Sequence, residues 1–191
     1  ATPIWIVVAL ILAVTHQSYV WFCWRTQLHT SLLTRTFGDR GFPLYATGFA
    51  ILALSRITSV VMVAAANRGT VPLDLTGLRV LAVVMTVPVI YLFYSVHRYF
   101  TFRRAFGVDH FDPSYHSRPL VRRGIFRFTR NGMYVFGLLM AWLPGLWYAS
   151  AAGLVLALFN HAYVWVHYFA TERPDMKRIY PKVMATPQPP A

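Results

Sequence analysis

Acidic side chains are scarce in this chain, so each of them is a candidate for a specific role. The 191 residues include 18 lysines and arginines but only six acids. The single glutamate, Glu172, lies where the last apolar segment ends and a basic tail begins. On a helix, His161, Trp165 and Tyr168 fall on the same face as Glu172, and a carboxylate beside aromatic rings suits a cationic ligand. The other acids are Asp39, Asp74, Asp109, Asp112 and Asp175.

These patterns also have structural interpretations. Tryptophan and tyrosine are common in the aromatic belt at a membrane surface, which would account for Trp165 and Tyr168 without a ligand. A carboxylate at the end of a helix often pairs with a nearby cation, and Arg173 or Arg178 would serve for Glu172.

Arginines dominate the largest polar stretch of the chain, from Tyr99 to Arg130. Between Ser117 and Tyr134 they are interleaved with apolar side chains. This pattern is typical of a segment that lies at a membrane surface and contacts phosphate headgroups. It also fits an anion-binding loop above a pocket that faces the membrane.

Two polar side chains, Arg56 and His16, lie near the middle of apolar segments. A buried arginine costs at least about 2.5 kcal/mol at the centre of an isolated spanning helix. Arg56 should therefore face the helix bundle and have a partner, either His16 or Gln17 or a lipid phosphate in a cavity. The alternative is a structural polar contact between helices.

The composition predicts an all-α integral membrane protein. Hydrophobic residues make up 57% of the chain and charged residues 13%, with a mean hydropathy of +0.46. A soluble domain carries about a quarter charged residues, and a spanning helix needs about 20 apolar residues. The apolar runs predict a bundle of five transmembrane helices, of which the last two form a hairpin that turns near Pro144 to Ser150. The expected spans are about 4–24, 42–66, 80–97, 133–147 and 150–170.

Positive charge is distributed unevenly along this bundle. Segments 25–41, 97–131 and 171–191 carry fifteen of the eighteen lysines and arginines. By the positive-inside rule, these segments and the C-terminus are cytoplasmic and the N-terminus lies outside. We expect the charge to meet anionic lipid headgroups rather than nucleic acid.

One membrane domain is therefore expected over residues 1–182. Its loop 98–131 and its segment 171–182 should form a site that faces the cytoplasm. The Pro-rich residues 183–191 are expected to be a disordered tail.

Several classes of chemistry find no support in the sequence. It has no Gly-rich phosphate loop and no nucleophile elbow. No metal is expected, because His161 and His167 lie on different helix faces and His110 and His116 lack a third ligand.

Two segments, joined by the predicted hairpin, resemble the membrane methyltransferase superfamily. Its members include isoprenylcysteine carboxyl methyltransferases and phospholipid N-methyltransferases. The first motif of the family, Gly-x-Tyr-x-x-x-Arg-His-Pro-x-Tyr, aligns with residues 124–134. Gly124, Arg130, Met133 and Tyr134 fit the motif, while Phe126, Asn131 and Gly132 replace its tyrosine, histidine and proline.

The second motif follows the hairpin. Where the family has two glutamates, this chain has Glu172 and Arg173, and Tyr180 matches a later aromatic position. The tail from Glu172 to Tyr180 looks more like the phospholipid branch. The resemblance covers residues 117–182, and the first two spans carry no family signature.

The resemblance implies S-adenosylmethionine as the methyl donor and a membrane lipid or lipid-borne acceptor. Glu172 would pair with a cationic or hydroxylic part of the donor. Arg130, with Arg127 or Arg123, would hold its carboxylate through a fork of N–H donors. The implied cofactor-binding residues are Gly124, Arg127, Arg130, Asn131, Tyr134, Tyr168 and Glu172.

An amine acceptor would have to lose a proton before methyl transfer, so a base is needed. His167 is also consistent with a satisfied interior histidine, and the acids around His110 are also consistent with turn chemistry. Arg56 and His16 are the candidate substrate-binding residues. The candidate bases are His167, Asp109, His110, Asp112 and His116.

Four functions stay open at this point. The first is methylation of an ethanolamine-type amine on a phospholipid, and the second is an isoprenylcysteine-type carboxyl methyltransferase. The third is an NADPH-dependent sterol-type reductase, because those enzymes resemble the same C-terminal architecture. The fourth is a lipid-binding membrane protein that kept the fold without catalysis.

Overall fold

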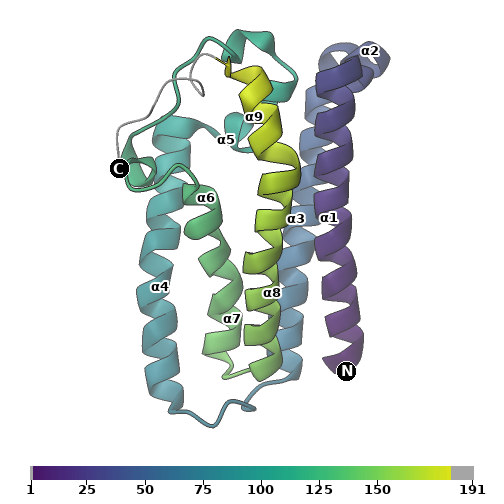
Figure 1. Ribbon diagram of the computed structural model, residues 1–191. Coiled ribbons are helices and arrows are strands. Elements are labelled where there is room, and N and C mark those ends of the chain that lie inside the picture. Colours follow the sequence, from purple (N-terminus) through teal and green to yellow (C-terminus); the bar gives the residue numbers. More distant parts are fainter. Residues whose placement is uncertain (1, 182–191) are drawn as a thin grey trace.

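The structure, a computed structural model, describes residues 2–181 and is built from helices throughout that part of the chain. Four long helices run side by side along the bundle: α1 (Thr2–Thr30), α3 (Gly41–Ala66), α4 (Leu75–Ser95) and α8 (Ala151–His167) (Figure 1). No strand occurs within residues 2–181. The prediction of an all-α fold is confirmed.

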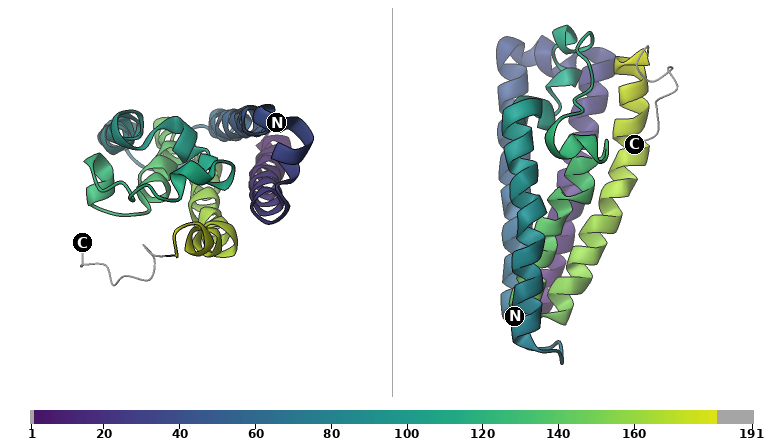
Figure 2. Two further views of the ribbon diagram at one scale, coloured as in Figure 1. Left: turned by 90° about the horizontal axis from the view of Figure 1, so that it is seen from above. Right: turned by 90° about the vertical axis from the view of Figure 1, so that its left-hand side faces the viewer.

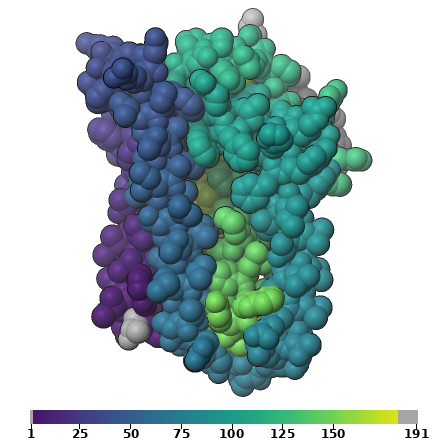
Figure 3. Space-filling model, turned by 180° about the vertical axis from the view of Figure 1, so that it is seen from behind, coloured from purple at the N-terminus to yellow at the C-terminus, as the bar shows by residue number. Residues whose placement is uncertain are grey.

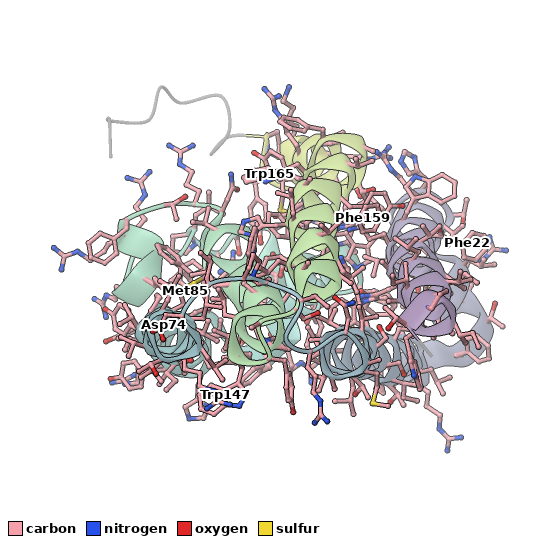
Figure 4. The ribbon with its side chains drawn as sticks, turned by 90° about the horizontal axis from the view of Figure 1, so that it is seen from below. Phe22, Asp74, Met85, Trp147, Phe159 and Trp165 are labelled. Carbon is pink, nitrogen blue, oxygen red and sulfur yellow. The ribbon has the colours of Figure 1, made fainter. Side chains whose placement is uncertain are left out.

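Three helical stretches are long and apolar enough to cross a membrane, namely Thr2–Thr30, Leu32–Ala66 and Leu75–Phe100. They contain the first three predicted spans, 4–24, 42–66 and 80–97. Exposed apolar side chains such as Phe22 and Trp147 point outward from the bundle (Figure 4). This outward apolar surface suits a lipid environment.

The last two predicted spans correspond to the two limbs of a helical hairpin. The descending limb consists of α6 (Gly132–Val135), the 3-10 segment η6 (Gly137–Ala141) and α7 (Trp142–Trp147). The ascending limb is α8, which continues through the π-helical segment η7 (Tyr168–Glu172) into α9 (Arg173–Ile179). The two limbs form the predicted hairpin, while the count of five spans stays a prediction.

The hairpin turns at Tyr148–Ser150. The connector 67–74, which links α3 to α4, forms hydrogen bonds that hold this turn in place. Gly69 N–H donates to the Tyr148 carbonyl over 2.9 Å. The Ser150 hydroxyl caps α8 by accepting from Gly153 N–H at 3.0 Å and donates to Asn67 Oδ1 at 3.1 Å. Pro144, expected near the turn, instead lies in the first turn of α7, where proline needs no hydrogen-bonded N–H.

The remaining elements lie between these helices along the chain. The short helices are α2 (Leu32–Phe37) and α5 (Phe102–Ala105), and a second π-helical segment, η2 (Val96–Phe100), ends α4. The 3-10 segments are η1 (Gly38–Arg40), η3 (Val108–His110), η4 (Pro113–Tyr115) and η5 (Gly124–Arg127).

The basic segments gather at one end of the bundle. Residues 25–41, 97–131 and 171–181 lie at the upper end in Figure 1, and the chain between α4 and α6 crosses the top of the bundle in Figure 2. The connector 67–74 and the hairpin turn lie at the opposite end. The helix arrangement therefore separates charge as predicted, while the side of the membrane that each end faces stays a prediction. The predicted tail 183–191 lies outside the described residues.

Topology is testable with single cysteines at exposed arginines, because the native Cys23 is buried. With an impermeant thiol reagent on intact cells, Arg68→Cys should react, and Arg127→Cys should react only after permeabilisation. The opposite labelling pattern would invert the predicted orientation.

Candidate functional site

The hairpin brings the two sequence motifs into direct contact. Tyr134, in α6, donates its hydroxyl hydrogen bond to Glu172 Oε2, at the end of η7, across 38 residues of sequence. The rings of Trp165 and Tyr168 meet the Tyr134 ring edge-on, each with centroids 6.1 Å away. The lone glutamate thus lies beside an aromatic cluster, as its sequence pattern predicted.

The π-helical segment η7 carries this part of the site. Thr171 is 1% exposed, and the Ala170 carbonyl accepts a 2.7 Å hydrogen bond from Arg25 of α1. Single π turns inside α-helices are frequent at functional sites. His161, expected on the same face as Glu172, instead accepts a hydrogen bond from Trp142 Nε1 at 3.2 Å and does not line the cavity.

A cavity extends from this contact in two directions. An outer compartment of about 160 Å³ reaches toward the arginine-rich loop, and an inner one of about 250 Å³ reaches down between α1, α3 and α8. Glu172 borders both compartments and therefore lies where they meet. The other residues that border both are Phe100, Arg104, Asp109, Met133 and Met176.

Glu172 has no ion-pair partner among residues 2–181. Arg173 lies over the Phe169 ring, and Arg178 contacts His29, so neither fulfils the helix-end pairing considered above. Glu172 lies just beyond the fifth expected span, where burial raises the pKa of its carboxyl, although the hydrogen bond from Tyr134 opposes that shift. A cationic ligand would provide the compensation that the protein does not.

Arg104 organises the wall between the compartments. Its guanidinium lies 3.3 Å from Asp109 Oδ2 and donates to the Tyr180 hydroxyl at 2.9 Å and to the Pro119 carbonyl at 3.2 Å. Tyr180 donates in turn to Asp109, and burial together with that bond raises the Tyr180 pKa. Arg104 is not among the site residues predicted from the sequence, because nothing in the local sequence distinguishes it from the neighbouring Arg103.

Asp175 fastens α9 to the rest of the site. It is 1% exposed and lies 3.0 Å from Arg25 of α1 and 3.3 Å from His110 Nε2. His110 also contacts the Gly107 carbonyl through Nδ1 and stacks on Trp24 at 4.1 Å. Segments far apart in the sequence are therefore joined at one buried acid.

Replacement of Asp175 by alanine should lower the free energy of unfolding by about 2 kcal/mol. Removal of one partner of a buried ion pair costs about 3–5 kcal/mol, and we discount this because Arg25 is 29% exposed. Thermal unfolding in detergent would measure the loss, with Asp39→Ala, an exposed acid, as the control. Equal stability of the two variants would contradict the structural role of Asp175.

Two of the five candidate bases keep an unpartnered atom in the cavity wall. His167 Nδ1 and Asp109 Oδ1 are buried and have no hydrogen-bond partner among residues 2–181, and both residues line the inner compartment. His110 also lines it, but both of its ring nitrogens are engaged as described. The last two candidates line neither compartment: Asp112 is exposed and accepts from Ser114 N–H at 2.9 Å, and His116 contacts the Asp109 carbonyl at 2.9 Å.

The predicted cofactor residues divide into two groups. Arg130, Asn131, Tyr168 and Glu172 line the outer compartment, and Tyr134 lines the inner one. Gly124 and Arg127 line neither, which corrects the expectation for both. Gly124 adopts φ +61° beside Ser95, where a side chain would overlap Ser95, and Arg127 is exposed over the Phe128 ring.

The two candidate substrate residues, Arg56 and His16, both line the inner compartment. Arg56 Nε donates to Asn160 Oδ1 over 2.6 Å, so its protein partner is neither His16 nor Gln17. The His16 ring packs edge-on against Phe49, with centroids 4.8 Å apart.

Comparison with known proteins gives the class of this chain. The family model for phospholipid methyltransferases matches residues 78–183, which is more than half of the chain. The chain therefore belongs to the phospholipid methyltransferase family, and the resemblance to the membrane methyltransferase superfamily is confirmed. It matches none of the curated proteins or solved structures with which it was compared.

Proposed function

We propose that this protein transfers a methyl group from S-adenosylmethionine to the amine of an ethanolamine-type membrane phospholipid, at a site facing the cytoplasm. The contact between Tyr134 and Glu172 carries the proposal, because it joins the two family motifs at a cavity. Membership of the phospholipid methyltransferase family supports the reaction class.

The residues of the outer compartment fit the charges of this donor. S-adenosylmethionine, when bound, supplies a methyl group activated by a sulfonium cation, and it also carries an ammonium and a carboxylate. Glu172 offers a cationic part of the donor a carboxylate that has no ion-pair partner within residues 2–181. Arg130 and Asn131 line the same compartment and suit the carboxylate, while Tyr168 provides an aromatic wall.

The inner compartment suits the acceptor. Phe49, Leu138 and Val164 contribute apolar walls that limit the access of water, and a dry site favours a displacement reaction whose nucleophile must be aligned. His167 is the base in this proposal, because its Nδ1 has no hydrogen-bond partner in the described part of the chain and a neutral imidazole can take the proton of an ammonium. Asp109 is less available, because Arg104 and Tyr180 already hold it.

The first experiment separates the candidate cofactors. Purified protein in detergent is titrated with S-adenosylmethionine, S-adenosylhomocysteine and NADPH. Binding of the two adenosyl compounds supports the proposal. Binding of NADPH alone would favour the reductase, and binding of none would favour a lipid-binding protein without catalysis.

The second experiment identifies the acceptor. Protein in vesicles of mixed phospholipids, with a prenylated cysteine peptide added, is supplied with donor that carries a labelled methyl group. We expect label in the ethanolamine phospholipid. Label confined to the prenylated cysteine would replace the proposed acceptor by the carboxyl methyltransferase alternative.

A further inference from the structure

The inner compartment contains a group of buried polar side chains, of which the proposed chemistry uses only His167. His16 and Gln17 come from α1, Arg56 from α3 and His167 from α8, and each is 8% or 9% exposed. All but His167 belong to helices that precede residues 78–183, so the family match does not include them. We call His16, Gln17 and Arg56 the inner polar cluster.

Arg56 is held firmly but is only partly satisfied. Its Nε donates to Asn160 Oδ1, and the Asn160 side-chain nitrogen donates to the Leu156 carbonyl at 2.8 Å, which fixes the orientation of the amide. One terminal nitrogen of Arg56, Nη2, is buried and has no hydrogen-bond partner in the described residues 2–181. No acid among residues 2–181 pairs with this guanidinium, which keeps its charge in proteins.

The other two members of the inner polar cluster, His16 and Gln17, also have buried polar atoms that lack a hydrogen-bond partner among residues 2–181. Gln17 Nε2 and both ring nitrogens of His16 are buried, and none of them has a hydrogen-bond partner within the part of the chain that the structure describes. Buried polar atoms are almost always hydrogen-bonded, and an unpaired one costs about 1–3 kcal/mol. The unused atoms of Arg56 and Gln17 are donors, and a histidine supplies a donor from either nitrogen. Donors around one fixed positive charge suit an anion.

The position of the inner polar cluster is consistent with a lipid anion. In the space-filling view from behind, the surface is hollowed between α3 and α4 above residues of the hairpin (Figure 3). Phe49 of α3 and Phe100 of η2, which continues α4, line the inner compartment from these two sides. An acyl chain could leave the cavity sideways through this hollow, whereas a free water-soluble anion would gain nothing from apolar walls.

We infer that the inner polar cluster binds the phosphate diester of the acceptor lipid, with Arg56 as its principal contact. This inference rests on the proposed function, because the bound phosphate would orient the acceptor lipid for the proposed methyl transfer. Seven residues of α8 separate Asn160 from His167, a rise of about 10 Å along the helix axis. A phosphate near Arg56 would therefore direct the headgroup amine along α8 toward His167 and Glu172.

The test compares two amphiphiles that share an amine and differ in the phosphate. Delipidated wild-type protein and Arg56→Gln are titrated with diacyl phosphatidylethanolamine and with a long-chain primary amine, with bound lipid counted by native mass spectrometry. Arg56→Gln should weaken binding of the phospholipid about tenfold, because a charge-assisted hydrogen bond is lost. Binding of the amine and of S-adenosylmethionine should be unchanged.

Three controls keep the result interpretable. Arg68→Gln, at an exposed arginine of the far connector, should bind both lipids as the wild type does. Arg56→Lys should restore part of the affinity, because it keeps the charge but not the fork of donors. If Arg56→Gln does not fold, Gln17→Leu removes a donor at similar volume and should selectively weaken phospholipid binding.

Two outcomes would overturn the inference. The first is equal loss, or no loss, for the phospholipid and the amine in Arg56→Gln and Gln17→Leu. The second is displacement of the phospholipid by inorganic phosphate at the same concentration, which would assign the site to the free anion. In both cases, retained S-adenosylmethionine binding by the wild type would leave the proposed function standing, whereas its absence would remove the function itself.

Discussion

Replacement of His167 by asparagine is expected to lower the turnover number for methyl transfer about a hundredfold, the usual range for loss of a general base being about 10²–10⁴. The imidazole is 9% exposed in the inner compartment, and its Nδ1 has no partner within residues 2–181. Asparagine keeps a polar side chain of smaller size but cannot accept a proton at neutral pH. The affinity for S-adenosylmethionine should change little, because His167 lies below the outer compartment.

The matched control for this experiment is His161→Asn in the same helix. His161 accepts a hydrogen bond from Trp142 and lines neither compartment of the cavity. Its replacement should therefore leave the turnover number within about twofold of the wild type. A base acts on the ammonium form of the acceptor, so the loss in His167→Asn should shrink as the pH approaches the pKa of the free amine. Equal turnover by both variants would remove His167 from the mechanism and direct attention to Asp109.

Glu172→Gln should weaken S-adenosylmethionine binding between about tenfold and a hundredfold, the loss expected for a hydrogen bond to a charged group, about 1.5–3 kcal/mol. Glutamine keeps the size of the side chain and its contact with Tyr134 but removes the negative charge. Calorimetric titration would measure the change. Asp112→Asn, which removes an exposed acid outside the cavity, should bind the donor as the wild type does.

The pH dependence of binding provides a second readout for the same residue. Only the carboxylate form of Glu172 attracts a cation, and burial raises its pKa. As the pH falls, wild-type affinity should therefore decline earlier than it would for an ordinary exposed glutamate. In Glu172→Gln this part of the decline should be absent. A wild-type profile identical to that of the variant would contradict the role of the charge.

The sequence predicted the overall arrangement because apolar length and charge asymmetry are strong signals. The runs containing Arg56 and Pro88 are long and apolar enough to cross a membrane, and the structure places the basic connectors at one end, as expected. The hairpin was also predictable, because Pro144 and Gly145 interrupt a 38-residue apolar stretch. The exact turn was not, because it depends on hydrogen bonds that Asn67 Oδ1 accepts and Gly69 N–H donates, some eighty residues earlier in the chain.

The site was predictable where family motifs and helical periodicity agreed. Tyr134, Tyr168 and Glu172 meet, because the hairpin returns the end of α8 to the level of α6. Arg104 could not be found, since its importance comes from Asp109 and Tyr180, which are distant in sequence or separated by irregular turns. Gly124 was assigned to the cofactor from its motif position, whereas its positive φ beside Ser95 gives it a backbone role.

Photolabelling tests the central claim most directly, namely that the two motifs on the hairpin together hold the methyl donor. Protein is irradiated with tritiated S-adenosylmethionine, digested and mapped by mass spectrometry. We predict label within residues 130–134 and 168–173, abolished by excess S-adenosylhomocysteine. Label confined to other segments, or unaffected by that competitor, would contradict the account.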